Sequence, residues 1–329
     1  MERGARRPGF LVNPERMTTR PLSIGFAGLG VMGRPMASHL AAAGHRMTLY
    51  DVVPGLAQGV AATLAAADPH VASTPAELAA RSDIVITMVP NGTVVEKLVR
   101  GDDGLLRGLR PGSLVLDTSS SEPWLTEATG RVLAEAGVAM VDAPVSGAEW
   151  GAQAAELVFM CGGAAADLER VRPLLDVMGK AVFHLGPLGA GHAMKCLNNL
   201  VTAINFVAVT EGLAIGKRCG LDPAAMVDVL DQSTGMSWIS RTHIRQRVLS
   251  RSFDDPFKLA LMLKDIGIAT QLARSVDVPA PLSALNQELW RAAAADAAPD
   301  ASVSELARWI ERLAHTEITP GATQRVPGR

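Results

Sequence analysis

The chain has 329 residues, 48% of them hydrophobic, and its 31 basic and 33 acidic side chains leave a formal net charge of −2. This length and composition predict two domains with substantial cores, whereas the balanced charge and the scarcity of aromatic residues argue against a nucleic-acid partner. With no uncharged apolar run of roughly 18 residues and no metal-ligand spacing among Cys161, Cys196 and Cys219, we expect a cytoplasmic protein with reduced thiols, no membrane association and no metal.

The first folded segment has the order strand, glycine-rich turn, helix. A strand predicted at 22–27 runs into the turn, and a helix follows at 34–43. Within the turn, Gly28 permits the tight bend, Gly30 lets the backbone approach a pyrophosphate, and Gly33 lets helix and strand pack closely. This context predicts a dinucleotide site, which a bare GxGxxG pattern would indicate only weakly. The turn residues predicted to touch the cofactor are Gly28, Leu29, Gly30, Val31, Met32 and Gly33.

Asp51 is the second part of the predicted dinucleotide site. It follows a strand at 46–50 and stands eighteen residues after Gly33, near the position where an acid holds the ribose hydroxyls. An acid there also repels a 2′-phosphate, and residues 52–54 include no arginine to neutralise one. NAD is therefore favoured over NADP as the cofactor. The alternative is a solvated aspartate at a strand end.

Later strands bring two polar turns to one edge of the predicted sheet. The apolar strand at 83–90 is of the kind that a parallel sheet buries on both faces, and the strand at 113–117 ends in a hydroxyl-rich turn at 118–121. Such serines are usually helix caps, yet open α/β folds bind ligands at this end of their strands. A strand at 139–142 leads to Ser146-Gly147, whose N–H groups and hydroxyl suit a carboxylate, although the pattern alone indicates only a turn. Further strands are predicted at 157–161 and 181–185, with a helix between them at 164–178.

Lys195 is the leading candidate for chemistry. It lies near the start of a long apolar helix predicted at 194–220, shares a face with Asn199 four residues later, and has Asn198 at the neighbouring position. Desolvation and the positive helix end both lower the pKa of a lysine placed there, which suits a general acid or base. Considered alone, a lysine in such a place is more often one that snorkels at a helix start.

Charged residues in the remaining helices are expected to be structural. Lys264 and Asp265 form a charged pair inside an apolar helix, for which an ion pair is the default explanation. Arg241, Arg245 and Arg247 crowd one helix. We expect them to form a solvated face, the alternative being an inward arginine that binds a second carboxylate. These later helices are predicted at 223–232, 237–249, 258–275, 281–295 and 303–314.

The predicted fold class is an α/β N-terminal Rossmann-type domain followed by an all-α C-terminal domain. The dinucleotide-binding domain is expected at 21–186 and the helical domain at 187–316. Residues 1–20 and 317–329 are expected to be disordered tails.

Taken in order, four motifs resemble the β-hydroxyacid dehydrogenase family, which includes 3-hydroxyisobutyrate dehydrogenase. They are the glycine turn continued to Ala37, the segment 142–147, the segment 189–199 with its lysine and two asparagines, and the pair Lys264-Asp265. The resemblance extends from residue 22 to about 315. It implies a dehydrogenase acting on CH–OH groups of a small hydroxy acid, an active site in the cleft between the domains, and a homodimer or homotetramer formed through the helical domain.

The resemblance also implies roles for individual residues. Lys195 matches the catalytic lysine, and Asn199 the amide beside it. Ser146 and Gly147 match the turn that anchors the substrate. The residues that match family positions around the nicotinamide half of the cofactor are Val89, Pro90, Ser120 and Lys264. Ser120 also matches a position at the substrate.

This chain departs from the family pattern near the substrate turn. Ala148 stands where the family commonly has a second glycine, Ala155-Glu156 where it commonly has glycine followed by threonine or serine, and Ser120 replaces a common threonine. We expect a short 3-hydroxy acid of about three to five carbons, because residues 146–156 offer no lysine or arginine for the phosphate of a sugar acid.

Two alternatives stay open. One is a reductase of a small semialdehyde or imine on the same scaffold, and the other is a catalytically inert dinucleotide-binding module. Imine reductases and inert relatives typically lack the lysine, so Lys195 argues against an imine reductase and against an inert module.

Overall fold

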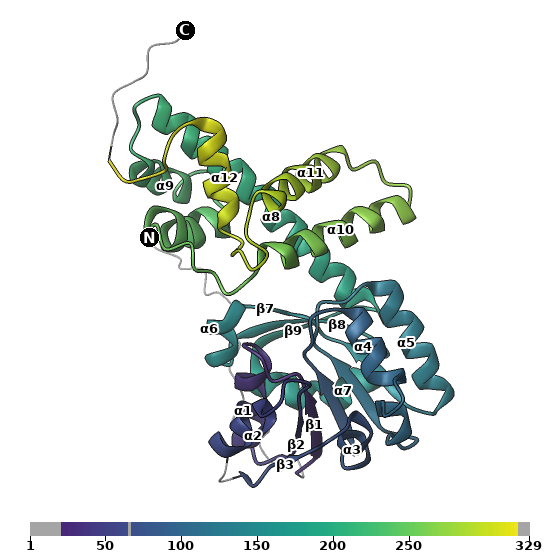
Figure 1. Ribbon diagram of the computed structural model, residues 1–329. Coiled ribbons are helices and arrows are strands. Elements are labelled where there is room, and N and C mark those ends of the chain that lie inside the picture. Colours follow the sequence, from purple (N-terminus) through teal and green to yellow (C-terminus); the bar gives the residue numbers. More distant parts are fainter. Residues whose placement is uncertain (1–20, 65–66, 322–329) are drawn as a thin grey trace, which may run out of the picture.

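The computed structural model describes residues 21–64 and 67–321, which form two domains stacked end to end (Figure 1). A sheet covered by helices forms the N-terminal domain, and helices alone form the C-terminal domain. The predicted fold class is therefore confirmed. The predicted tail at 1–20 lies outside the described residues, as do residues 322–329 of the predicted C-terminal tail.

The first domain is built on a sheet whose described strands have the order β3-β2-β1-β4-β5-β6-β8-β7, with β9 paired to β8. Neighbours from β3 to β6 are parallel, β8 is antiparallel to β6 and β7, and β9 is parallel to β8. The strands are β1 (Ser23–Ala27), β2 (Arg46–Tyr50), β3 (His70–Val71), β4 (Ile84–Thr87), β5 (Leu114–Asp117), β6 (Ala139–Asp142), β7 (Val145–Ser146), β8 (Leu157–Gly162) and β9 (Gly179–Gly186).

Alternate side chains of the parallel strands fill two cores, one on each face of the sheet. Ile84 and Leu114 belong to the core under α1, α2 and α7, while Val85 and Val115 belong to the core under α3, α4 and α5. Because both faces are covered, these strands are continuous apolar runs in the sequence. The helices of this domain are α1 (Gly33–Ala42), α2 (Leu56–Thr63), α3 (Pro75–Ala80), α4 (Gly92–Arg100), η3 (Leu105–Arg107), α5 (Pro123–Glu135), α6 (Ala148–Gln153) and α7 (Ala165–Met178).

The long helix α8 (Ala190–Arg218) is the axis of the helical domain. It packs against β8 at its start and against α10, α11 and α12 further along. Its Phe206 lies buried against Trp290 of α11, with ring centroids 6.1 Å apart. The other helices are α9 (Pro223–Asp231), η4 (Ile239–Leu249), α10 (Leu259–Ser275), α11 (Pro281–Ala295) and α12 (Glu305–Ala314).

Of the helices in the described chain, α8 alone is long and apolar enough to cross a membrane, with a mean hydropathy of 1.4 over its most apolar window. The same helix carries Lys195 and contacts elements of both domains. Its apolar composition therefore has an explanation in the packing of the two domains.

The helix predicted at 237–249 is wound differently from the expectation. Residues Ile239–Leu249 form a π-helix, η4, rather than an α-helix. The spacing of apolar residues in this stretch does not distinguish the two windings, because it reports only which side of a helix is buried.

The tail predicted to be disordered from residue 317 is ordered as far as the structure describes it, so that prediction was wrong for 317–321. Ile318 is fully buried, and its N–H donates to Glu311 Oε1 at 2.6 Å. Lys217 of α8 donates to the carbonyl oxygen of Thr319 at 2.9 Å. A single isoleucine among threonine, proline and glycine gave no periodic signal from which this docking could be predicted.

Candidate active site

The predicted site residues lie along the carboxyl ends of the parallel strands. The strand order 3-2-1-4-5-6 reverses direction between β1 and β4, and open α/β sheets bind ligands in the crevice at such a switch point. The turns that follow β1, β4 and β5 meet at this edge. α10 of the helical domain reaches the same edge, where Lys264 contacts the turns after β4 and β5.

The glycine turn after β1 has the geometry that each glycine predicts. Gly28 has a φ of +93°, and a Cβ added to it would collide with the carbonyl oxygen of Met88. A Cβ on Gly33 would collide with the carbonyl oxygen of Gly28, because α1 packs closely on the turn. At Gly30, by contrast, no atom of the described chain lies within 4 Å of the Cβ position. The open face at Gly30 leaves room for a pyrophosphate next to the backbone.

Asp51 ties the end of β2 to the glycine turn. Its Oδ2 accepts from the Leu29 N–H at 2.7 Å, and its Oδ1 accepts from the Val53 N–H at 2.8 Å. The Leu29 side chain is buried in the core, whereas the Val31 side chain is exposed. Leu29 thus supports the carboxylate and has no N–H left for a phosphate. Each carboxylate oxygen keeps a lone pair with which it can accept from a ribose hydroxyl.

Lys264 joins the two domains beside the residues predicted to surround the nicotinamide. Its Nζ donates to the carbonyl oxygen of Pro90 at 3.3 Å and to that of Ser120. The turn after β4 is fixed to the turn after β5, because the Val89 N–H donates to Ser119 Oγ at 3.0 Å. The structure therefore brings together Val89, Pro90, Ser120 and Lys264, which lie far apart in the sequence.

Asp117 organises the turn after β5, a role that the sequence analysis missed. This fully buried carboxylate accepts from Thr87 Oγ1 at 2.8 Å, from the Ser119 N–H at 3.0 Å and from Ser121 Oγ at 3.2 Å. The hydroxyl-rich turn is thus folded around a carboxylate at the strand end. The signal in the sequence was an aspartate at the end of an apolar strand.

Asp142 fastens the start of α8 to the end of β6. Its two oxygens accept from the N–H groups of Gly189 and His192, each at 2.8 Å. The fully buried His192 ring reaches back to the hydroxyl-rich turn, with Nδ1 2.8 Å from Thr126 Oγ1 and Nε2 3.1 Å from the Ser119 carbonyl oxygen. This network fixes the first turn of α8, three residues before Lys195, relative to the sheet.

A chain of polar contacts links Lys195 to α10. Lys195 Nζ donates to Asn199 Oδ1 at 3.2 Å, and Asn198 Nδ2 donates to the same oxygen at 3.2 Å. Asn199 Nδ2 donates to Asp265 Oδ2 at 2.6 Å, and Asp265 Oδ1 lies 3.3 Å from Lys264 Nζ. The expected ion pair of Lys264 and Asp265 is therefore present. The contact of Asp265 with the amide beside Lys195 was not predicted, although a carboxylate inside an apolar helix was the signal for it.

The surroundings of Lys195 favour its neutral form. Burial lowers the pKa of this half-buried lysine below its ordinary value of 10.5; the charge of Asp265 opposes this shift, and that of Lys264 adds to it. Burial raises the pKa of the adjacent Cys196 thiol to about 12. Burial thus keeps the Cys196 thiol protonated and unreactive.

Ser146 and Gly147 form the turn between β7 and α6. Ser146 is half-buried, and its hydroxyl has no hydrogen-bond partner in the described part of the chain. Gly147 has a φ of +138°, a conformation that glycine adopts without strain. No direct hydrogen bond joins the turn to Lys195 among the described residues. Asp142 links the two regions of the chain, because it ends β6, which the turn follows four residues later, and its side chain holds the start of α8.

The two alanines at which this chain departs from the family pattern have left-handed conformations: Ala148 is the first residue of α6, and Ala155 follows the end of α6 by two residues. Ala148 has a φ of +53° and Ala155 a φ of +54°. Glycine is the residue that adopts this region without cost. The backbone at both positions thus has a conformation that suits glycine, although each residue is an alanine.

Two of the three arginines in η4 form ion pairs at the surface. Arg245 Nη2 lies 2.6 Å from Asp228 Oδ1, and Arg247 Nη1 lies 2.5 Å from Asp254 Oδ1. The acidic residues of α9 and of the loop after η4 lie opposite them, which the sequence spacing did not indicate. Arg241 is exposed and has no ion-pair partner in the described chain.

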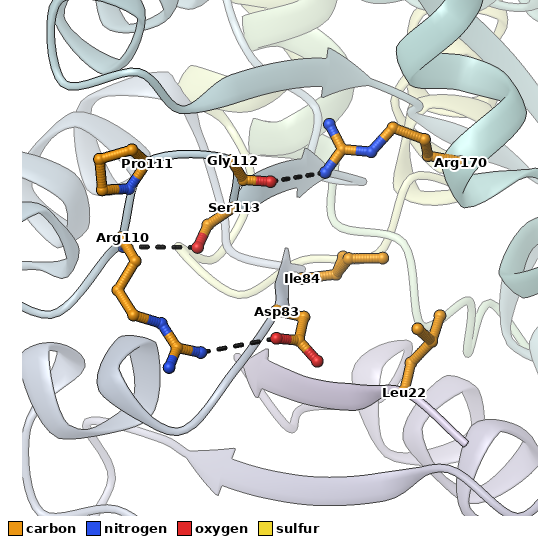
Figure 2. A pocket seen from close by; sticks show the side chains of 8 residues that line it. All are labelled: Leu22, Asp83, Ile84, Arg110, Pro111, Gly112, Ser113 and Arg170. Carbon is orange, nitrogen blue, oxygen red and sulfur yellow. Dashed lines mark hydrogen bonds and ion pairs between the residues drawn. The ribbon is translucent and has the colours of Figure 1, made fainter. Parts of the chain in front are cut away.

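A cavity of about 580 Å³ lies at the opposite, amino end of the strands (Figure 2). Arg110 faces Asp83 across it at 3.5 Å, and Arg170 donates to the carbonyl oxygen of Gly112 at 2.7 Å. None of the predicted site residues lines this cavity. Since open α/β sheets bind their ligands at the carboxyl ends of the strands, the cavity is separate from the candidate site.

Comparisons with known proteins match both halves of the chain. Residues 23–186 match the profile of the NAD-binding domain of 6-phosphogluconate dehydrogenase, and residues 189–310 match the profile described as NAD-binding of NADP-dependent 3-hydroxyisobutyrate dehydrogenase.

Individual proteins are similar over nearly the whole chain. The 2-(hydroxymethyl)glutarate dehydrogenase of Eubacterium barkeri is 32% identical over 92% of this chain and 99% of its own. The 3-hydroxyisobutyrate dehydrogenase of Pseudomonas aeruginosa is 37% identical over 81% of this chain and 90% of its own. The structure of Mycobacterium tuberculosis 3-hydroxyisobutyrate dehydrogenase with L-serine matches with a TM-score of 0.80 and 33% identity, covering 88% of this chain and 99% of that one.

Proposed function

Because the chain belongs to the β-hydroxyacid dehydrogenase family, we propose that it is an NAD-dependent dehydrogenase that oxidises a short 3-hydroxy acid, with Lys195 as general acid/base. The position of Lys195 carries the proposal. The lysine lies half-buried near the start of α8, hydrogen-bonded to Asn199. Through Asp265 and Lys264 it is connected to the turns after β4 and β5. A proton-transfer group thus stands beside the edge at which a dinucleotide-binding sheet holds its ligand.

Each residue of the site has a separate role in the oxidation. When bound, the nicotinamide supplies the hydride acceptor. Neutral Lys195 accepts the proton of the substrate hydroxyl as the hydride leaves the same carbon, and in the reverse direction it returns that proton. Its pKa, lowered by burial, makes the neutral amine available at a lower pH. Asn199 Oδ1 holds the amine, and the Ser146-Gly147 turn, whose hydroxyl has no partner among the described residues, anchors the substrate carboxylate.

NAD is the proposed cofactor. Asp51, at the end of β2, is placed to accept from the ribose hydroxyls and would repel a 2′-phosphate. The two residues that follow it, Val52 and Val53, are exposed and carry no charge. The unpaired state of Cys161, Cys196 and Cys219 supports a cytoplasmic location.

A short acid is the proposed substrate, with 3-hydroxyisobutyrate or a close relative as the first candidate. The turn from Ser146 to Glu156 contributes two glutamates and no cation, and Arg245 and Arg247 are occupied by ion pairs. Arg241 lacks such a partner in the described chain, which makes a dicarboxylate such as 2-(hydroxymethyl)glutarate the second candidate.

A panel of acids tests the proposal. We expect turnover of 3-hydroxyisobutyrate or L-serine with NAD, followed by NADH absorbance, and none of 6-phosphogluconate. Preference for 2-(hydroxymethyl)glutarate, lost in Arg241→Ala, would select the second candidate. Reduction of a small imine without oxidation of any hydroxy acid would favour the reductase alternative. Tight NAD binding with no turnover in either direction would favour the inert module.

We also propose a homodimer formed through the helical domain. Leu197 and Val201, four residues apart on α8, are 42% and 58% exposed. Val278, Leu282 and Leu285 are each more than half exposed at the hairpin of α10 and α11, which projects from the domain (Figure 1). Grouped exposed apolar side chains of this kind mark surfaces that a second copy covers.

A further inference from the structure

Asp265 is a buried carboxylate set between a lysine and an amide. Its side chain is 1% exposed, Oδ2 accepts a hydrogen bond of 2.6 Å from Asn199 Nδ2, and Oδ1 lies 3.3 Å from Lys264 Nζ. A carboxylate removed from water at this depth is costly unless its neighbours compensate the charge. Lys264 supplies the opposite charge and Asn199 the hydrogen bond.

The carboxylate decides which way the Asn199 amide points. An ionised carboxylate only accepts hydrogen bonds, so the amide turns Nδ2 towards Asp265 and Oδ1 away from it. Oδ1 then accepts from Lys195 Nζ and Asn198 Nδ2, both at 3.2 Å. In a flipped amide, an N–H group would face the lysine ammonium and an oxygen would face the carboxylate, and both contacts would be repulsive.

We propose that Asp265 is a positioning residue for Lys195: it fixes the Asn199 amide that holds the lysine amine, and its negative charge acts on that amine. The proposal rests on the proposed function, in which Lys195 exchanges the proton of the substrate hydroxyl. It gives α10 a part in the chemistry although Asp265 need not touch the substrate.

The ionisable groups that face Lys195 come from α10 and from α8 itself. Burial is the largest cause of its lowered pKa; Asp265 and Cys196 act in the opposite direction, and Lys264 adds to the lowering. Glu122, at the start of α5, acts on Cys196 in the same region. Removal of the Asp265 charge therefore lowers the pKa of Lys195 further, whereas removal of the Lys264 charge raises it.

The first test is the pH dependence of kcat/KM for oxidation at saturating NAD. The value of kcat/KM rises with pH as Lys195 loses its proton. This rising limb of the pH profile moves to lower pH in Asp265→Asn and to higher pH in Lys264→Met. In Asp265→Asn, kcat also falls roughly 10- to 100-fold, because the amide is no longer held in place. The matched control is Glu311→Gln, which removes a buried carboxylate paired with Arg251 elsewhere in the same domain and leaves the limb in place.

The second test is a double-mutant cycle. Since Asp265 acts on turnover through Asn199, the variants Asn199→Ala, Asp265→Asn and their combination lower kcat to a similar extent. Additive losses in kcat overturn the proposal, and so does a pH limb that stays in place in both single variants of α10. If Asp265→Asn does not fold, the shift of the rising limb of the pH profile in Lys264→Met tests the proposal.

Chemical labelling of Lys195 separates this proposal from the proposed function. The rate at which acetic anhydride acylates the Lys195 peptide, followed over pH by mass spectrometry, reports the pKa of the amine whether or not the lysine takes part in turnover. If the labelling curve is displaced in Asp265→Asn but Lys195→Ala turns over normally, Asp265 does act on the Lys195 amine, and the acid/base role of Lys195 is refuted. A labelling curve that is not displaced refutes the action of Asp265 on Lys195.

Discussion

Lys195 can serve as an acid or base because its half-buried position lowers its pKa from the ordinary 10.5. For oxidation the lysine must be neutral, so kcat/KM should rise with pH and level off below the range of a solvated lysine. We expect Lys195→Ala to abolish this limb and to lower kcat by a factor of roughly 100 to 10,000, with NAD affinity little changed. Lys180→Ala, at an exposed lysine of the same chain, is the control, and near-normal turnover by Lys195→Ala would refute the mechanism.

Asp51 sets the cofactor preference by its charge. In Asp51→Ser the repulsion of a 2′-phosphate disappears and a hydroxyl remains for the ribose, so the ratio of kcat/KM for NADP to that for NAD should rise. The variant should also loosen the glycine turn, because Asp51 accepts from the Leu29 N–H. The measurement is steady-state kinetics with both cofactors. A wild-type enzyme that already prefers NADP would show the argument from Asp51 to be wrong.

Ala148 carries backbone strain that glycine would relieve. Its φ of +53° lies in the left-handed region, so Ala148→Gly should raise the free energy of unfolding by roughly 0.5–1 kcal/mol, after the added flexibility of the unfolded chain is subtracted. Ala154→Gly is the matched control, since Ala154 has a φ of −85° and should lose stability on the same change. Urea unfolding should show that the free energy of unfolding rises in Ala148→Gly and falls in Ala154→Gly.

At the scale of elements, the regular periodicity of the chain was enough to predict the architecture. Strands such as β4 and β5 are apolar throughout because both faces are buried, and this pattern is visible in the sequence. The candidate residues could be grouped only by resemblance, since Lys264 and Pro90 are 174 positions apart. The partners of buried carboxylates were not predictable, because the pattern marks Asp265 as unusual without indicating that it faces Asn199.

The segment after α12 is an element that local patterns missed, and its contribution to stability can be measured. Ile318 is fully buried, so Ile318→Ala should lower the free energy of unfolding by roughly 2–5 kcal/mol. Leu313→Ala, at a side chain that is 61% exposed on α12, should cost much less. Equal losses in urea unfolding would mean that the segment does not stay docked.

At the scale of the whole molecule, the exposed face of α8 should be covered by a second copy. Val201→Glu places a charge on that face, so we expect it to shift the protein from dimer to monomer in light scattering after size-exclusion chromatography. Lys97→Glu, on an exposed position of α4 in the other domain, is the control. A wild-type protein that is monomeric at micromolar concentration would contradict the proposed dimer.

The length of α8 affects how the two domains can move, because only its first turn is fastened to the sheet. Asp142 clamps its first turn, and its 29 residues extend for about 43 Å into the helical domain. Over the rest of that length it packs against α10, α11 and α12, so it moves with the helical domain, and Lys195 lies near the fastened end. A rotation of one degree about the first turn moves the far end of α8 by roughly 0.75 Å over that length. A rotation of the helical domain about this turn would therefore displace the outer helices while it leaves the lysine amine close to the strand ends.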